Sequence, residues 1–85
     1  PSYLLYGNTN VTSVALPATV THVGDYAFSH CQMLQTVTLP ESIEFFGMGV
    51  FNDSPSLQEI RVPRKKVASY NKLGLKEYRN LIVKY

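Results

Sequence analysis

The sequence contains no tryptophan, a single cysteine and no long hydrophobic segment. One cysteine cannot form a disulfide within the chain, so the cysteine content does not fix the redox compartment. No apolar run approaches the roughly 18 residues that suggest a membrane-spanning helix. The sequence begins at Pro1 without a recognisable signal peptide, and we expect a processed or excised fragment of a longer protein.

Lysine and arginine are absent from the first 60 positions. That part of the chain carries five acidic residues: Asp25, Glu41, Glu44, Asp53 and Glu59. Residues 61–85 reverse the balance, with eight Lys or Arg residues against one acidic residue, Glu77. The net charge of +2 therefore combines −5 in residues 1–60 with +7 in residues 61–85. This abrupt change in composition predicts a structural boundary, and a functional one is also open.

The side chains that carry chemistry do not form a catalytic constellation. No phosphate-binding or dinucleotide-binding glycine motif occurs, and no nucleophile-elbow pattern surrounds the serines. His30 and Cys31 are adjacent, but no third group orients the histidine, so we expect Cys31 to be a buried structural thiol. His22, His30 and Asp25 are expected at the surface rather than around a metal. The sequence thus predicts neither an enzyme nor a cofactor or metal site.

The clearest feature is an internal repeat of 23 residues. A shift by 23 positions aligns seven identical pairs: Val14/Val37, Leu16/Leu39, Pro17/Pro40, Gly24/Gly47, Phe28/Phe51, Leu34/Leu57 and Gln35/Gln58. Ile60, Val62 and Pro63 begin a third copy. A fixed period of about 20–29 residues, with apolar residues at fixed offsets, predicts a solenoid, in which each repeat packs only against its neighbours.

Each repeat contains a segment of alternating apolar and polar residues that ends in proline, at 11–17, 34–40 and 57–63. This alternation predicts half-buried β-strands, and each proline ends its strand because it lacks a backbone donor. Equivalent strands should be parallel neighbours. Their inward side chains would form two ladders: Val14, Val37, Ile60 and Leu16, Leu39, Val62.

A second apolar stretch follows each proline, at 20–24 and 43–47, and ends in Gly24 or Gly47. These glycines predict a positive φ or a tight turn on the far side of the repeat. Short helical or 3₁₀ turns should then place Phe28 and Phe51 in the interior. Truncation of either phenylalanine to alanine is expected to cost about 3–5 kcal/mol.

The ends depart from the repeat, and we divide one domain, 1–85, into residues 1–10, 11–63 and 64–85. Residues 1–10 are the tail of a preceding repeat or an N-terminal cap. In residues 64–85, apolar positions recur at three- and four-residue spacing: Val67, Tyr70, Leu73, Leu75, Tyr78 and Ile82. This spacing predicts two short helical segments broken at Gly74. Their apolar side should cover Phe51, Leu57, Ile60 and Val62, while 82–85 alternatively forms a last strand.

The second repeat resembles a known family. It reads Cys31-x-x-Leu34-x-x-Val37-x-Leu39-Pro40-x-Ser42-Ile43-x-x-Phe46-Gly47-x-x-Val50-Phe51, and this unit resembles the BspA-like leucine-rich repeat, also called the Treponema pallidum type. The tail resembles the C-terminal closing segment of many such proteins, on the pattern Val62-Pro63 … Tyr70 … Leu75-x-x-Tyr78-x-x-x-Ile82. Two departures are Ser54-Pro55 where Cys is typical and Leu75 where Trp is common.

The resemblance implies a surface-exposed or secreted protein, mostly from bacteria of host-associated communities. Some members are adhesins that bind host matrix proteins or other bacteria. No ligand residues are shared across the family, so none can be carried over to this chain.

We therefore expect a cell-surface protein-binding or adhesion module, with the outward face of the strands as its contact surface. Its outward residues are Ser13, Ala15, Thr36, Thr38, Glu59 and Arg61. The alternative is a purely structural role, in which this segment closes a longer repeat array and the ligand surface lies elsewhere. The basic run Arg64-Lys65-Lys66 is expected to be a solvated face of the cap rather than a nucleic-acid or membrane site.

Overall fold

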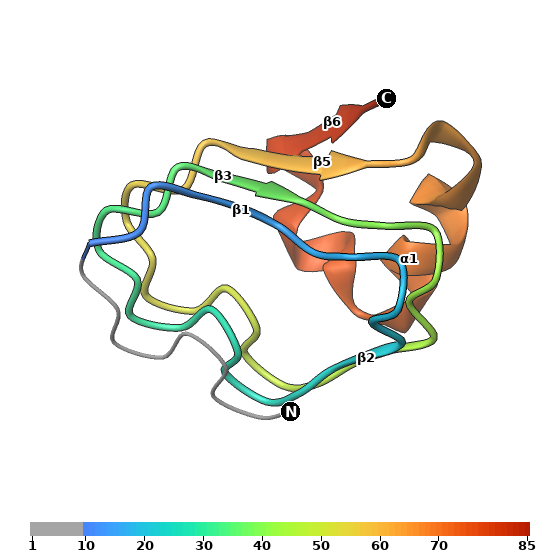
Figure 1. Cartoon of the computed structure of the whole chain (residues 1–85), viewed down its shortest axis with the longest axis horizontal. Helices are drawn as coiled ribbons and strands as arrows, with labels where there is room; N and C mark the ends of the chain where they lie inside the picture. Colours follow the sequence, from blue (N-terminus) through green and yellow to red (C-terminus); the bar gives the residue numbers. More distant parts are fainter. Residues whose placement is uncertain (1–9) are drawn as a thin grey trace.

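The structure, a computed structural model, describes residues 10–85. Its four-stranded parallel sheet has the order β1-β3-β5-β6, and a two-stranded parallel sheet joins β2 to β4 (Figure 1). The first sheet contains β1 (Ser13–Ala15), β3 (Thr36–Thr38), β5 (Glu59–Val62) and β6 (Ile82–Lys84). The second contains β2 (His22–Val23) and β4 (Phe45–Phe46). Between β5 and β6 lie the 3₁₀ segment η1 (Arg64–Lys66), the helix α1 (Val67–Leu73) and the 3₁₀ segment η2 (Leu75–Leu81).

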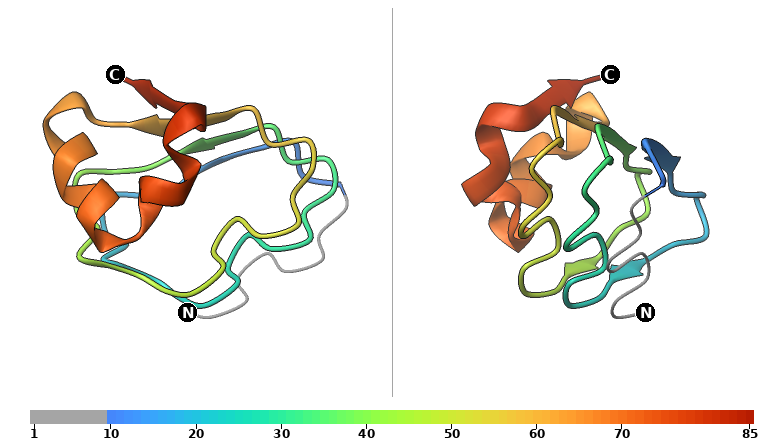
Figure 2. Two further views of the ribbon diagram at one scale, coloured as in Figure 1. Left: turned by 180° about the vertical axis from the view of Figure 1, so that it is seen from behind. Right: turned by 90° about the vertical axis from the view of Figure 1, so that its left-hand side faces the viewer.

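The predicted stacking of equivalent strands is confirmed. Val14 pairs with Val37 and Val37 with Ile60, all in parallel strands and 23 residues apart. The side chains of Val37 and Ile60, the second and third members of this ladder, are fully buried, because β3 and β5 each have a neighbouring strand on both sides. Figure 2 (right) shows the repeats side by side when the molecule is turned by 90°. The interpretation of residues 1–10 lies, except for Asn10, outside the described residues.

The second apolar stretch of each repeat forms a sheet of its own, which the sequence did not predict. β2 pairs with β4 in parallel, with His22 opposite Phe45 and Val23 opposite Phe46. Val23 and Phe46 point inward and are buried, whereas His22 and Phe45 are exposed. The two sheets enclose the hydrophobic core between them (Figure 1).

The segments after these strands are single turns closed by i→i+3 hydrogen bonds, from Ala27 N–H to the Gly24 carbonyl at 3.3 Å and from Ser29 N–H to the Tyr26 carbonyl at 3.1 Å, and they do not extend into a regular 3₁₀ helix. The backbone N–H groups of Tyr26, Phe28 and His30 donate to carbonyls of the next repeat at 2.8–3.0 Å. Alternate residues thus bond from repeat to repeat, while Ala27 and Ser29 between them close the local turns, so the segment does not continue as a helix. Phe28 and Phe51 do lie in the core, as predicted, with rings stacked 5.5 Å apart.

The glycines that end the second stretch do not have the expected positive φ. Positive φ falls instead at the paired positions Tyr26/Gly49 and His30/Asp53. A Cβ atom on Gly47 would lie 2.5 Å from the backbone nitrogen of Asp25. Gly47 is therefore required by the close approach of two repeats rather than by its own dihedral angles.

The turn position shared by Cys31 and Ser54 links neighbouring repeats. The Ser54 hydroxyl donates to the carbonyl of Phe28 at 2.6 Å and accepts from the backbone N–H of Cys31 at 3.3 Å. The Cys31 side chain is fully buried, as predicted, and its Sγ contacts the carbonyl of Ser29 at 3.7 Å. The third repeat thus replaces a buried thiol with a hydroxyl that bonds backbone.

Residues 64–85 contain the predicted helical segments, and the break at Gly74 is confirmed. Residues 82–84 also form a strand, since Ile82 of β6 pairs with Ile60 of β5. Tyr78 packs edge-on against Phe51 with ring centres 5.3 Å apart, so the segment does cover the last repeat. The expected inward position of Leu73 is wrong, because this side chain is among the exposed hydrophobic residues at the end of α1.

Tyr70 reaches past the last repeat into the second one. Its hydroxyl donates to the carbonyl of Pro40 at 2.5 Å and accepts from the backbone N–H of Ile43 at 3.2 Å. In the first repeat, the equivalent turn closes directly, with Val20 N–H donating to the Pro17 carbonyl at 3.1 Å. The Tyr70 hydroxyl is therefore inserted into the second turn, where it bonds both backbone groups.

Candidate functional site

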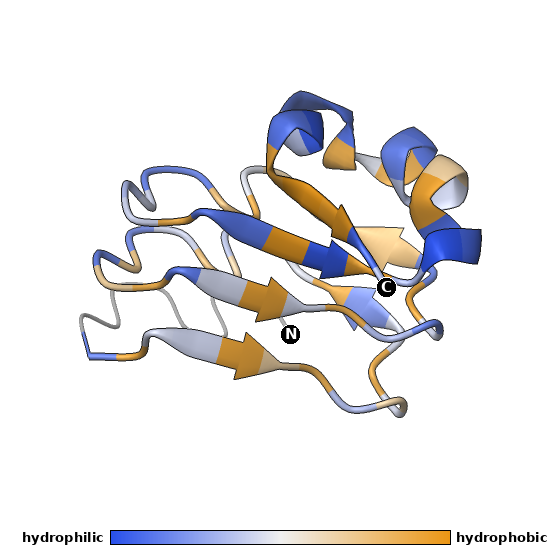
Figure 3. Ribbon diagram, turned by 90° about the horizontal axis from the view of Figure 1, so that it is seen from above, coloured by the Kyte–Doolittle hydropathy of each residue, from blue (hydrophilic) through white to orange (hydrophobic). Residues whose placement is uncertain are grey.

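The predicted contact residues lie on the outward face of the four-stranded sheet, here called the strand face. The strand register places Ser13, Thr36 and Glu59 in one row and Ala15, Thr38 and Arg61 in a second row. Figure 3 looks onto this face, on which the polar character increases from β1 and β3 to β5. The six side chains are therefore brought together as neighbours, as the repeat period requires.

The strand face changes in chemistry from one edge to the other. Short side chains occupy β1 and β3, and the residues of β5 carry charges, with Arg61 Nη1 lying 3.7 Å from Glu59 Oε1. Both of these side chains are partly solvated, so their ion pair contributes little to stability. The first two strands can offer hydrogen bonds and close approach, whereas β5 can offer charge.

Sequence reasoning left two residues out of this face, Val83 and Tyr85. Val83 pairs with Arg61 across β5 and β6 and so extends the second row by one strand. The Arg61 guanidinium lies 6.0 Å from the centre of the Tyr85 ring, which is within the range of a cation–π contact. The sequence signal for this extension was the alternative prediction that residues 82–85 form a last strand.

A pocket of about 440 Å³ opens beside Tyr85 and is here called the Tyr85 pocket. Its lining residues are Glu41, Pro63, Arg64, Lys65 and Tyr85. Lys65 Nζ lies 2.9 Å from Glu41 Oε1, and this hydrogen bond raises the pKa of the Lys65 ammonium above its usual 10.5. The pocket thus combines an aromatic wall with two cationic side chains and one carboxylate.

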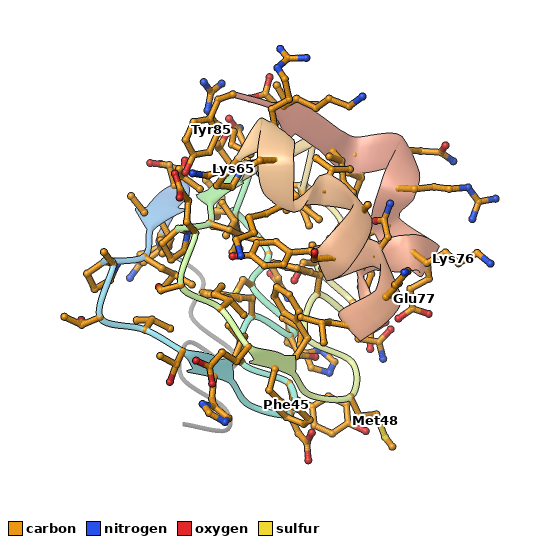
Figure 4. All side chains as sticks on the ribbon, turned by 90° about the vertical axis from the view of Figure 1, so that its right-hand side faces the viewer. Phe45, Met48, Lys65, Lys76, Glu77 and Tyr85 are labelled. Carbon is orange, nitrogen blue, oxygen red and sulfur yellow. The ribbon has the colours of Figure 1, made fainter. Side chains whose placement is uncertain are left out.

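The basic run Arg64-Lys65-Lys66 forms η1, directly after β5. Arg64 and Lys65 are exposed and line the Tyr85 pocket, whereas Lys66 is half-buried. The run therefore divides between a solvated surface and a pocket, and Figure 4 shows Lys65 near Tyr85 and far from Lys76.

The histidines lie in separate surroundings. His30 Nε2 is 3.4 Å from Asp53 Oδ2 of the next repeat, not paired with Asp25. His22 Nδ1 lies 2.9 Å from Thr21 Oγ1, and the His22 ring lies 5.9 Å from that of Phe45. Within residues 10–85, no group of three or more His, Cys, Asp or Glu side chains is arranged to hold a metal ion.

Two other surface features lie away from the strand face. The exposed side chains of Phe45 and Met48 sit close together on the side of the second sheet (Figure 4). A wider hollow of about 930 Å³ lies among the turns that hold His30, Met33 and Asp53. The Tyr85 pocket differs from both, because it gathers two cationic side chains beside an aromatic wall that is hydrogen-bonded to Leu39.

Comparison with known proteins identifies the repeats. No helix in the described part of the chain is long and apolar enough to cross a membrane. No curated protein matches the sequence. The family model described as "BspA type Leucine rich repeat region (6 copies)" matches residues 1–82, nearly the whole chain and well into the segment that breaks the 23-residue period. This match confirms the resemblance carried by the second repeat, and the chain belongs to the BspA type of leucine-rich repeat proteins.

Proposed function

We propose that this chain is a protein-binding or adhesion module of a cell-surface or secreted protein, with the strand face as its contact surface. Its family is one of repeat modules for protein interaction and is typically non-enzymatic, which supports binding over catalysis. We also propose that the stacked repeats form a short open solenoid, whose strands present an extended surface. Residues 64–85 act as its cap, after repeats at 11–63 and a partial repeat or cap at 1–10.

The observation that carries this proposal is the meeting of Arg61 and Tyr85 at one end of the strand face. Arginine and tyrosine are enriched among the few residues that dominate binding energy in protein interfaces. Tyr85 remains 49% exposed, so half of its surface is open to a partner. The short side chains on β1 and β3 allow that partner to lie flat across the neighbouring strands.

The ligand that fits this proposal is a protein of the host matrix or of another cell surface. Site-directed photo-crosslinking tests it. A photoreactive residue in place of Thr38, at the middle of the strand face, should give a discrete adduct with one matrix or surface protein. Excess unlabelled chain should compete the adduct away. The same residue in place of Ala68, exposed on α1, is the matched control and should give none.

Equal labelling from both positions, or labelling that unlabelled chain does not compete, would contradict the strand face as the contact surface. The adduct is identified by mass spectrometry and then confirmed with the purified partner, because capture from a mixture alone does not establish a specific contact.

A second candidate function is supported by the edge of the sheet at β1, where no strand within residues 10–85 pairs with the outer side of β1. Val14 and Leu16 are only half-buried, whereas their counterparts Val37 and Leu39 are fully buried. A further repeat stacked on β1 would cover these two side chains, so the segment is also suited to close a longer array. Fusing one copy of residues 14–36 before residue 14 should then raise the melting temperature, since repeat arrays gain stability from each new interface. An unchanged melting temperature would count against this role.

A further inference from the structure

We propose that the Tyr85 pocket accepts a carboxylate side chain from an acidic segment of the protein partner. The inference rests on the proposed function, because it names the chemistry of the partner that binds at the β5–β6 end of the strand face. It adds a ligand class and a defined position: an Asp or Glu side chain seated against the Tyr85 ring, between Arg64 and Lys65.

The aromatic wall of the pocket is held from several sides. The Tyr85 hydroxyl donates to the carbonyl of Leu39 at 2.5 Å, which fixes the far end of the ring. The Tyr85 backbone N–H donates to the Val62 carbonyl at 3.0 Å, and its carbonyl accepts from the Arg64 N–H at 2.7 Å. A wall fixed in this way loses little conformational freedom when a ligand packs against it.

The chain itself shows which group the pocket accepts. The Glu41 carboxylate lines the pocket and lies 2.9 Å from the Lys65 ammonium, so one carboxylate already occupies part of the site. Both side chains of this pair are more than half exposed, and such pairs contribute at most about 1 kcal/mol. A carboxylate from a partner can therefore replace Glu41 at little cost.

Arg64 supplies the second cation. Its side chain is exposed, lines the pocket and makes no ion pair with any residue between 10 and 85. A guanidinium can bind a carboxylate through two parallel hydrogen bonds, which a lone ammonium cannot do. Arg64 and Lys65 together can thus hold one carboxylate more firmly than Lys65 holds Glu41.

The position of the pocket favours a protein partner over an acidic polysaccharide. Arg61 belongs to the strand face and also lies over the Tyr85 ring, so the pocket continues the surface proposed to bind protein. Residues 64–85 carry seven basic side chains against Glu77 alone, and this field attracts acidic partners as they approach. A partner lying across the strands would place an acidic segment at this end.

The direct test uses two fluorescein-labelled peptides, one of alternating Glu and Ser and one of alternating Gln and Ser, titrated with the full chain at low ionic strength. The Glu peptide should bind and the Gln peptide should not. In amide NMR spectra, the largest shifts should fall on Arg64 and Tyr85, whose backbone groups are bonded to each other. Shifts spread evenly over all basic residues would overturn the proposal.

Two pairs of variants separate the pocket from general charge attraction. Arg64→Gln should weaken binding of the Glu peptide by about tenfold, the effect of losing a hydrogen bond to a charged group. Lys76→Gln makes the same change in net charge on η2, away from the pocket (Figure 4), and should change binding by less than about twofold. Equal losses in both variants would overturn the proposal.

The second pair predicts a gain. Glu41→Gln removes the internal carboxylate, so the Glu peptide should bind several-fold more tightly. The matched control Glu44→Gln changes the net charge equally but alters an exposed residue that does not line the pocket, and it should have a smaller effect. Weaker binding by Glu41→Gln would show that this carboxylate does not compete for the site. Melting temperatures of all four variants should match the parent, since each site is a solvated surface.

The remaining outcomes distinguish this inference from the proposed function. If polygalacturonate shifts the amide NMR signals of Arg64 and Tyr85 and the Glu peptide does not, the ligand is an acidic polysaccharide and the inference is overturned. A protein could be crosslinked through position 38 and yet bind equally well to Arg64→Gln and Glu41→Gln. That result would contradict the carboxylate site in the Tyr85 pocket, while the strand face would stand as the contact surface. The Glu peptide could bind more weakly to Arg64→Gln and more tightly to Glu41→Gln while the photoreactive residue at position 38 crosslinks no protein. That result would support the pocket and contradict the proposed function.

Discussion

Replacing Tyr70 with phenylalanine removes one oxygen atom from the contact between α1 and the second repeat. The ring itself would remain packed edge-on against Phe46, with centres 5.4 Å apart. The change therefore isolates the two hydrogen bonds that the hydroxyl makes with Pro40 and Ile43. These two backbone groups are buried, so the loss in free energy of unfolding depends on whether they find other hydrogen-bond partners after the substitution.

The first repeat sets the lower limit of that cost. Its equivalent turn closes on itself, through the bond from Val20 N–H to the Pro17 carbonyl. If the second turn relaxes to the same geometry, only one net hydrogen bond is lost, about 0.5–1.5 kcal/mol. If the Tyr70 ring holds the turn open, buried backbone groups lose their partners, at about 1–3 kcal/mol each.

We expect a loss of about 2 kcal/mol, a large share of the roughly 4–13 kcal/mol total stability typical of a chain of this length. The melting temperature should fall by about 8–16 °C for a domain of this size. Thermal melts by circular dichroism, with urea titrations, measure the change. Tyr85→Phe is the comparison: it loses one bond, to Leu39, at a part-buried site, and should cost about 0.5–1.5 kcal/mol. A Tyr70→Phe melting temperature within about 1 °C of the parent would refute the argument, since even the lower limit predicts a fall of about 2 °C.

The same hydroxyl makes stability depend on alkaline pH. Burial raises the pKa of Tyr70 above its usual 10.0, and burial likewise raises the pKa of Tyr78. The folded chain then keeps these protons at a pH where the unfolded chain has lost them. Stability should therefore be complete below pH 10 and fall as the pH rises through the folded pKa values. In Tyr70→Phe, urea titrations above pH 10 should show a smaller fall than in the parent.

Three further outcomes are expected. A chain truncated after Pro63 should be unfolded or aggregated, because it loses β6, the Tyr70 contact and the cover of the last repeat; an unchanged melting temperature with loss of salt-sensitive binding would show a flexible basic arm instead. The thiol of Cys31 should react slowly with a thiol reagent in the native state and quickly in denaturant, because it is fully buried, and fast native labelling would revive a reactive cysteine. Gly47→Ala should destabilise the chain by about 1–3 kcal/mol by overpacking, because the new methyl group meets backbone atoms of Asp25 and Gly24; full stability would show that the repeats are less closely apposed.

The glycine and turn positions show where sequence reasoning reached the correct residue for the wrong reason. The recurrence of Gly24 and Gly47 marked a constraint on the backbone, but a sequence does not show whether the constraint is a dihedral angle or a neighbouring chain. The close contact joins Gly47 to residues of the preceding repeat. Likewise, alternate backbone N–H groups of the turn that carries Phe28 donate to carbonyls of the turn that carries Phe51, so local propensity alone did not decide the form of these turns.

The sequence by itself determined the repeat: its 23-residue period, its parallel strand register and the inward side chains of both ladders. This follows because identical residue types at one offset must occupy equivalent positions, and alternation along a strand fixes which side chains face the core. The strand face is the other half of the same alternation, so its six residues could be named in advance.

Only the tertiary structure decided what residues 64–85 contact. Three- and four-residue spacing predicts a helix and its apolar side, but it does not fix where that helix sits on the repeats. The hydroxyls of Tyr70 and Tyr85 find the adjacent carbonyls of Pro40 and Leu39, 30 and 46 residues away in sequence. No period relates these positions, and so the inserted tyrosine and the pocket beside Tyr85 arise from long-range packing, which a local pattern does not encode.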